Sequence, residues 1–311
     1  MIKKGIIDYL ADKLNIEAKE VIEKDLILHS LLYKIETNEY FKDNFVFKGG
    51  TCLIKCYLGY YRFSEDLDFT WINQKEFEGK SQKEIRRLLS VKIDKLISIF
   101  GDIANKTGLD FKEDKSNKNY IEIGGSNRLA TFKLRYKSGV LNTDSFIKIQ
   151  INFVELFLHP FLKSNVNSIA REIDFKEFGF LFPDDAKIFI KNLVVEAYDI
   201  REILIEKVRA ILTRRGIKAR DFIDVFSIAK EKKLDIKKLR NDILTKTRFM
   251  LRYRKYLQNL RDFQLEKFVL GEEEKLVLKP VDKEFPEFIK EFHVFLIELV
   301  NELKNKHSSG K

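Results

Sequence analysis

The chain is short of the residues that mark several protein classes. Its only two cysteines, Cys52 and Cys56, cannot supply the four ligands of a structural zinc site or the framework of a disulfide-rich secreted domain. No apolar run reaches the roughly 18 residues of a membrane helix. The amino terminus, MIKKGIIDYLADKL, has the charge alternation of an amphipathic helix and does not resemble a signal peptide. We therefore expect a cytoplasmic protein with no membrane partner.

Prolines and glycines are also few, four and fourteen in 311 residues, which predicts long helices and no low-complexity linker. Hydrophobic residues make up 44% of the chain, enough to build a core and to exclude a disordered protein. Lysine and arginine outnumber aspartate and glutamate by 58 to 48, a net charge of +10. The length fits one large domain or two ordinary ones.

Helix and strand signals divide the chain into two parts. In the first part, helical stretches alternate with strand-like segments, and in the two longer of these segments the apolar residues recur at every second position. The helical stretches are 2–14, 17–37 and 82–105, and the strand-like segments are 45–47, 130–136 and 147–153. From Asp199 onward the periodicity is helical. Asp199 and Glu202 have the D-x-x-E spacing of a capping box, and further helical stretches fall near 218–232, 235–262 and 285–305. The sequence therefore predicts an α+β fold, with a mixed or antiparallel sheet in a domain over residues 1–190 and a helical domain over residues 191–311.

The segment FVFKGGT, residues 45–51, has the features of a phosphate-binding turn. A short strand runs into Gly49 and Gly50, which can turn tightly because glycine has no Cβ to clash at positive φ. The helix that follows would present free backbone N–H groups to a phosphate. The Thr51 hydroxyl could cap this helix or face the phosphate.

Two carboxylates follow in the segment RFSEDLDF, residues 62–69. Asp66 and Asp68 are two residues apart on an expected strand, so both side chains point to one face and can share a Mg²⁺ ion. A phosphate-binding turn beside paired carboxylates is typical of metal-assisted phosphoryl or nucleotidyl transfer. Alone, either motif is more often an ordinary turn or a solvated surface. Arg62 and Ser64 could contact phosphate or hold the loop.

These motifs carry a resemblance to a known family. Together with KDLILHSLLY, EILIEKVRAIL and RRGIKARDFIDV further along the chain, they resemble the AbiEii/AbiGii toxin family of DNA polymerase β-like nucleotidyltransferases. The resemblance implies a minimal nucleotidyltransferase fold followed by a helical part. It also implies Mg²⁺-dependent use of a nucleoside triphosphate, with Mn²⁺ as a substitute. The expected role is the toxin of a toxin–antitoxin or abortive-infection system, with a cognate antitoxin and tRNA as one kind of acceptor.

The resemblance also implies roles for individual residues. It assigns Gly49, Gly50 and Thr51 to phosphate and Asp66 and Asp68 to the metal ion. Two later residues, Lys207 and Asp221, match a further functional pair of the family.

One position departs from the polymerase β-like pattern. Those enzymes usually carry a third carboxylate on a neighbouring strand, where it binds a second metal ion and can act as a base. Here the best candidate strand, residues 148–152, offers Gln150 on its polar face, and a neutral amide is a poor substitute for an anionic ligand. The strand could also be a plain wet sheet face. Two-metal catalysis would therefore need Asp221 or another carboxylate to fill this position.

The helix that begins near residue 200 carries Lys207 in the middle of its apolar stripe. At about 100° per residue, Lys207 falls on the same side as Ile203 and Ile211. A lysine in an apolar setting is costly unless an anion meets it. The anion could be Asp221 or Asp224 in a structural ion pair, or a nucleotide phosphate.

Residues 201–260 concentrate positive charge. They hold 18 Lys and Arg against 7 Asp and Glu, a net +11, and the basic residues are interleaved with Phe and Tyr. Phosphate contacts dominate nucleic-acid affinity, and aromatic rings can stack on exposed bases. The segment could be a solvated helical face with its aromatics in the core, or the surface that binds an RNA or tRNA acceptor.

Three functional interpretations follow from these observations. The leading one is a nucleotidyltransferase that moves a nucleoside monophosphate from a triphosphate to RNA. The second is a catalytically inactive module that binds nucleotide or RNA on the same scaffold, supported by the missing third carboxylate. The third is an enzyme with a small-molecule or protein acceptor, which the basic region disfavours.

Overall fold

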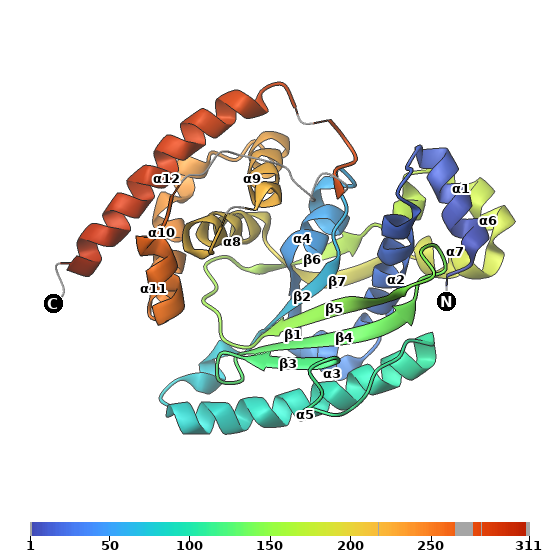
Figure 1. The fold of residues 1–311 in the computed structure, drawn as a ribbon, viewed down its shortest axis with the longest axis horizontal. Helices are drawn as coiled ribbons and strands as arrows, with labels where there is room; N and C mark the ends of the chain where they lie inside the picture. The colour runs from blue at the N-terminus through green and yellow to red at the C-terminus, as the bar shows by residue number, and fades with distance from the viewer. Residues whose placement is uncertain (1, 217, 265–275, 281, 309–311) are drawn as a thin grey trace. The chain divides into compact units, whose positions relative to one another are not determined.

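The computed structural model describes residues 2–216, 218–264, 276–280 and 282–308, and the chain divides into two units (Figure 1). The first unit consists of Met1–Glu155 and Phe161–Tyr198, and the second of Leu156–Pro160 and Asp199–Lys311. The chain thus passes from the first unit to the second for the last time after Tyr198, whereas the sequence suggested a domain boundary at about residue 190. The difference arises because residues 193–198 form a strand of the sheet.

The first unit is built from helices around one sheet, as the sequence predicts. Its helices are α1 (Lys4–Leu14), α2 (Lys19–Glu36), α3 (Glu39–Asn44), α4 (Gly49–Cys52), α5 (Gln82–Thr107), α6 (Phe175–Leu181) and α7 (Pro183–Phe189). Its strands are β1 (Phe45–Lys48), β2 (Asp66–Trp71), β3 (Ile121–Gly124), β4 (Leu129–Lys137), β5 (Asp144–Asn152), β6 (Phe161–Val166) and β7 (Leu193–Tyr198).

The seven strands described form a mixed sheet in the order β3-β4-β5-β2-β1-β7-β6. The pairs β2/β5 and β1/β7 are parallel, and the other neighbours are antiparallel. The predicted α+β fold with a mixed sheet is therefore confirmed. The order places β2, which carries the two candidate metal ligands, between β1 and β5 in the middle of the sheet.

The two faces of the sheet differ in polarity. Helices α2, α3 and α5 pack against one face (Figure 1). There the ring centroids of Phe41 in α3 and Phe69 in β2 lie 4.8 Å apart. The ring centroids of Phe100 in α5 and Phe132 in β4 lie 4.7 Å apart. Because side chains alternate along a strand, Asp66 and the other polar residues of β2 point to the opposite face.

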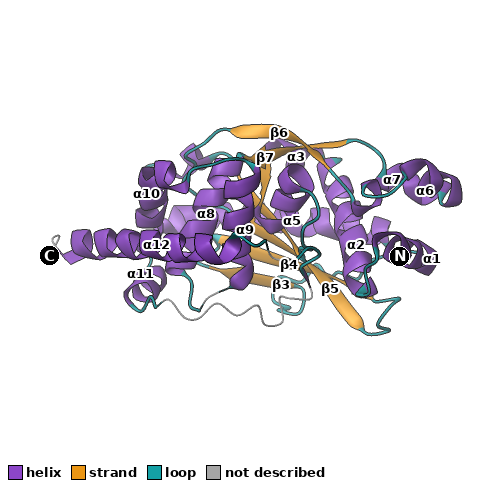
Figure 2. Cartoon of the chain, turned by 90° about the horizontal axis from the view of Figure 1, so that it is seen from above, coloured by secondary structure: helices purple, strands orange, loops and turns teal. Residues whose placement is uncertain are grey.

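The second unit is helical in the part of it that the structure describes (Figure 2). Its helices are α8 (Ile200–Thr213), α9 (Ala219–Glu231), α10 (Arg240–Leu251), α11 (Arg254–Arg261) and α12 (Phe285–Ser308), with a 3₁₀ turn at Ile236–Leu239. Helix α8 packs against α9, α10 and α11, and α12 packs against α9 and α10.

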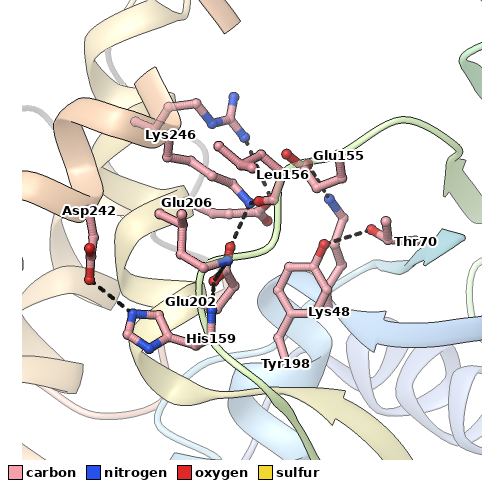
Figure 3. Close-up of polar contacts among 12 residues, drawn as sticks. Lys48, Thr70, Glu155, Leu156, His159, Tyr198, Glu202, Glu206, Asp242 and Lys246 are labelled. Atoms are coloured by element: carbon pink, nitrogen blue, oxygen red, sulfur yellow. Dashed lines mark hydrogen bonds and ion pairs between the residues drawn. The ribbon is translucent and has the colours of Figure 1, made fainter. Parts of the chain in front are cut away.

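Residues 156–160 are bound to the second unit by buried polar contacts (Figure 3). The Glu202 carboxylate accepts hydrogen bonds from the backbone N–H groups of Leu158 and His159, at 3.0 and 2.9 Å. The Lys246 ammonium, itself fully buried, lies 2.6 Å from Glu202 and donates to the Leu156 carbonyl at 2.6 Å. Glu202 therefore holds this segment and does not close a capping box.

The amino-terminal cap of α8 comes from one residue. The Asp199 carboxylate accepts from the backbone N–H of Arg201 at 2.8 Å, which satisfies one of the free donors of the first turn. The Arg201 side chain donates back to the same carboxylate at 2.9 and 2.7 Å. The cap predicted at Asp199 is thus present without its predicted partner Glu202.

Candidate functional site

The glycine turn lies directly against one of the two carboxylates. Strand β1 ends at Lys48, Gly49 adopts a φ of +81°, and α4 begins there before continuing as a π-helical segment at Leu53–Leu58. A Cβ added to Gly49 would lie 2.2 Å from Oδ2 of Asp68, far inside van der Waals contact. Both the backbone angle and the close approach therefore require glycine.

The two residues before the carboxylate pair reach the same turn. A Cβ on Gly50 would lie 2.9 Å from a guanidinium nitrogen of Arg62 and 3.1 Å from the Ser64 hydroxyl. Arg62 is buried and donates to the Phe63 carbonyl at 2.7 Å. The structure thus brings Arg62 and Ser64 to Gly50. This position suits either a phosphate contact or a loop support, so the predicted phosphate role stays a prediction.

The carboxylates sit on β2 as their spacing predicts. Asp66 and Asp68 share one face of the strand, and both are partly exposed while Leu67 between them is buried. The buried Thr51 hydroxyl donates to the backbone carbonyl of Asp66, so it ties α4 to the strand that carries the pair. The phosphate contact suggested for Thr51 stays a prediction.

A cation and an amide occupy the neighbouring strand. In the parallel pair of β2 and β5, Asp66 is in register with Lys148 and Asp68 with Gln150. The Lys148 ammonium lies 3.8 Å from Oδ1 of Asp66. Strand β5 is therefore the neighbour expected to carry a third carboxylate, and Gln150 takes that place. Across the described residues, no group of three or more His, Cys, Asp and Glu side chains forms a ready metal site.

The helical segment after the turn is anchored by a buried ion pair. Lys55, one turn beyond the glycines, is 1% exposed, and its ammonium lies 2.8 Å from the Asp25 carboxylate of α2. The Tyr60 hydroxyl donates to the same carboxylate at 2.8 Å. Burial lowers the pKa of Lys55 even beside this carboxylate, so the position is costly without its partner. These contacts fix the segment that carries the turn.

Lys48 is a residue of this site that sequence reasoning missed. It is in register with Asp68 on the antiparallel ladder, so its side chain projects from the same sheet face. Its ammonium lies 3.7 Å from the Glu155 carboxylate and 5.5 Å from the centroid of the Tyr198 ring (Figure 3). The place of Lys48 immediately before Gly49 was the available signal. Its partners are more than a hundred residues away, and no local pattern marks them.

The second unit holds the other predicted pair. The Lys207 ammonium lies 2.9 Å from Asp221 and 2.7 Å from Asp224, and Arg214 also pairs with Asp221. Burial of Asp221 favours its neutral form, but the charges of Lys207 and Arg214 outweigh this, so its pKa lies below the usual value. The two aspartates are 4% and 0% exposed, which makes this a buried ion cluster. The ion-pair alternative for Lys207 is thus present with both aspartates.

The basic region exposes cations beside aromatic rings. Arg252, Arg254 and Lys255, at the junction of α10 and α11, are exposed. The Arg252 guanidinium lies 3.7 Å from the centroid of Phe249 and 5.0 Å from that of Tyr253. Both rings are partly exposed, so neither is confined to the core.

The chain resembles known proteins over most of its length. A family model described as "Nucleotidyl transferase AbiEii toxin, Type IV TA system" matches residues 30–301, which include every predicted site residue. JHP933 from Helicobacter pylori has a similar structure with a TM-score of 0.43 at 16% identity, covering 94% of this chain and 97% of that one. Another H. pylori protein, provisionally assigned as a nucleotidyltransferase, gives a TM-score of 0.40 at 18% identity, covering 93% and 98%. No curated protein matches.

None of the described helices combines the length and the apolar character needed to cross a bilayer.

Proposed function

Because the chain belongs to the nucleotidyltransferase AbiEii toxin family of type IV toxin–antitoxin systems, we propose that it transfers a nucleoside monophosphate from a nucleoside triphosphate to an RNA acceptor. The observation that carries this proposal is the contact between the glycine turn and the carboxylate pair, where Gly49 leaves no space for a Cβ beside Asp68. A turn suited to phosphate and a carboxylate suited to a metal ion thus meet at one point.

The donor set at this point fits a hard divalent cation. Asp66 and Asp68 offer carboxylate oxygens from one face of one strand, and Mg²⁺ is usually held by one or two carboxylates together with substrate phosphates. We propose these two residues as the Mg²⁺ ligands, with Mn²⁺ as a substitute. When bound, the ion would offset phosphate charge as a Lewis acid.

The other residues are assigned by their chemistry. Gly49, Gly50 and Thr51 form the turn that receives the triphosphate, and Arg62 and Ser64 support or extend it. In the reaction, an acceptor hydroxyl oxygen bonds to the α-phosphorus and its proton passes to solvent. The bond between the α-phosphorus and the α,β-bridging oxygen breaks, and pyrophosphate leaves.

The second unit supplies the remaining proposed groups. Lys207 is the proposed cation that offsets charge on the transferring phosphate. The low pKa and double ion pairing of Asp221 favour a role in holding Lys207 over a role as a base. Arg252, Arg254 and Lys255, with the neighbouring rings of Phe249 and Tyr253, are the proposed RNA-binding surface. A cognate antitoxin is the expected protein partner.

The test is a transfer assay with matched variants. The protein is incubated with each of the four α-labelled nucleoside triphosphates, Mg²⁺ and total tRNA, and label in RNA is measured after electrophoresis. Asp66→Asn and Asp68→Asn are expected to abolish transfer without loss of folding. Asp184→Asn, which changes an exposed aspartate of α7, should leave it intact. No transfer and no nucleotide binding by the unaltered protein would refute the proposal.

One observation favours the second candidate, a module that binds nucleotide or RNA without turnover. Gln150 and Lys148 stand where further anionic ligands would come from, beside Asp68 and Asp66. Asp66→Ala separates the two candidates in cells. Growth inhibition by the expressed protein would persist in this variant if binding suffices, and it would disappear if transfer is required.

A further inference from the structure

The ammonium group of Lys48, the residue before Gly49, is held by two groups that are themselves fixed (Figure 3). The Glu155 side chain, 2% exposed, lies 3.7 Å away and accepts a hydrogen bond from the Asn152 amide at 2.9 Å. The Tyr198 ring lies on another side of the ammonium, with its hydroxyl donating to Thr70 at 2.9 Å. The Lys48 side chain is 13% exposed, so it reaches solvent.

The backbone position of Lys48 makes this arrangement relevant to the nucleotide. Its peptide bond joins it to Gly49, and its side chain leaves the sheet on the face that carries Asp68. A lysine is a compact charge on a flexible four-carbon stem, which can exchange one anion for another without backbone movement. The 3.7 Å separation from Glu155 is longer than the 2.7–2.9 Å of a strong charge-assisted hydrogen bond.

We propose that Lys48 is a nucleotide-positioning residue, whose ammonium leaves Glu155 to contact a phosphate oxygen of the bound nucleoside triphosphate. The proposal rests on the proposed function, since it concerns the same nucleotide. Glu155 then competes with the nucleotide for one cation. A competing internal partner lowers the apparent affinity for a ligand by the fraction of molecules that it occupies.

Because of this competition, removing the charge of Lys48 and removing the charge of Glu155 should change the nucleotide affinity in opposite directions. Removing the cation in Lys48→Met weakens nucleotide binding, by about tenfold or more for the loss of a charge-assisted contact. Removing the competing charge in Glu155→Gln keeps the side-chain shape and tightens binding, by about threefold or more. A purely structural ion pair would not do this, because breaking it from either side has the same consequence.

The experiment measures dissociation constants for the non-hydrolysable α,β-methylene analogues of the four nucleoside triphosphates by isothermal titration calorimetry. The matched control is Lys92→Met, since Lys92 is also 13% exposed, pairs with Glu76 at 3.0 Å and lies 3.6 Å from the Trp71 ring centroid. It should leave the dissociation constant unchanged. Lys48→Arg, which keeps the charge, should stay within about threefold of the unaltered protein.

The double variant Lys48→Met/Glu155→Gln tests whether Glu155 affects nucleotide binding only through Lys48. It is expected to bind as weakly as Lys48→Met, because Glu155 acts only through Lys48. If instead both single variants weaken binding equally, or neither changes it while the unaltered protein binds, the proposal is overturned and the proposed function stands. If Glu155→Gln does not fold, Lys48→Met against Lys48→Arg and Lys92→Met still tests the cation. If the unaltered protein binds none of the analogues, both proposals fail.

Discussion

Gly49 and Asp68 are packed so closely that a single methyl group cannot fit between them, since a Cβ on Gly49 would lie 2.2 Å from Oδ2 of Asp68. The turn and the carboxylate therefore constrain each other. Any residue other than glycine must push Asp68 out of its present position or shift the turn. The contact also explains why the motif needs glycine at its first position as well as a positive φ.

Gly49→Ala should remove nucleotidyl transfer while leaving a folded protein. The strained backbone at a φ of +81° costs about 1–2 kcal/mol of stability, and the displaced Asp68 can no longer share a metal ion with Asp66. The loss of activity is measured by label transfer to tRNA. The loss of metal binding is measured with Mn²⁺ by electron paramagnetic resonance.

Gly79→Ala and Gly108→Ala separate strain from displacement. Both glycines have nearly the same positive φ, +69° and +70°, and a Cβ on either would meet nothing within 4 Å. They should lose similar stability, read from thermal unfolding, and keep transfer. Transfer lost in these controls as well would show that general strain, and not the contact with Asp68, causes the defect.

The sequence allowed the central part of the fold to be predicted because its signals are local. The strand before the glycine turn, the long helix α5 and the alternating strands β4 and β5 each follow from the spacing of apolar residues. Strands β6 and β7 escaped prediction because each has an exposed apolar residue that interrupts the alternation. Leu162 is 41% exposed and Val194 is 45% exposed, so the alternation that marks a half-buried strand is obscured.

In the candidate site too, features with a local sequence signal could be predicted and features that depend on distant residues could not. Asp66 and Asp68 could be placed on one face from their spacing alone, and the close approach of Gly49 agrees with the glycine signal. The partners of Lys48 could not be found, because Glu155 comes from a distant part of the chain. Glu202 shows the converse case: its spacing from Asp199 predicts a cap, but tertiary contacts with Lys246 and with residues 158–159 bind it instead.

The exposed cations at the junction of α10 and α11 should account for much of the RNA affinity. Reversing Arg252, Arg254 and Lys255 to Glu is expected to weaken tRNA binding and to reduce the slope of log K against log salt, by about one unit for each phosphate contact removed. Filter binding at several salt concentrations measures both. Because these side chains are exposed, the melting temperature should change little.

The control for this variant reverses three exposed lysines of the first unit, Lys83, Lys106 and Lys112. It carries the same change in net charge. Equal loss of affinity in both triple variants would mean that RNA responds only to total charge, and the assignment of the junction as the acceptor surface would be wrong.

His29 should make the stability of the first unit depend on pH. The ring is fully buried in α2, and burial, with the charge of Lys55 nearby, holds its pKa well below the usual value. The unfolded chain therefore binds a proton below about pH 6.5 that the folded protein does not, so stability is retained above this pH and lost as the pH falls. The loss is at most about 1.4 kcal/mol per pH unit.

His29→Leu removes this titration. Urea unfolding at about pH 8 and about pH 5 should show a smaller difference in free energy of unfolding for the variant than for the unaltered protein. His293→Leu is the comparison variant and should reduce this difference less, because burial lowers the pKa of His293 but not as far as that of His29. An unchanged pH dependence in His29→Leu would contradict the expectation.

Lys207 neutralises two buried carboxylates, so a single substitution of Lys207 is expected to affect stability as well as any catalytic role. Lys207→Met removes the ammonium that lies 2.9 Å from Asp221 and 2.7 Å from Asp224. Breaking a buried ion pair from one side costs about 3–5 kcal/mol, because an uncompensated charge stays behind. The single variant is therefore expected to be strongly destabilised, and a loss of transfer in it would not identify a catalytic role.

The double variant Lys207→Met/Asp224→Asn removes one charge of each sign, while Arg214 still pairs with Asp221. It should recover most of the lost free energy of unfolding, since the remaining charges are balanced. Transfer is nevertheless expected to stay at least about two orders of magnitude below that of the unaltered protein, because a cation that offsets charge on the transferring phosphate is absent. Asp224→Asn alone keeps the cation and should retain most activity. If the double variant regains transfer together with stability, Lys207 serves the fold of the second unit and has no part in the reaction.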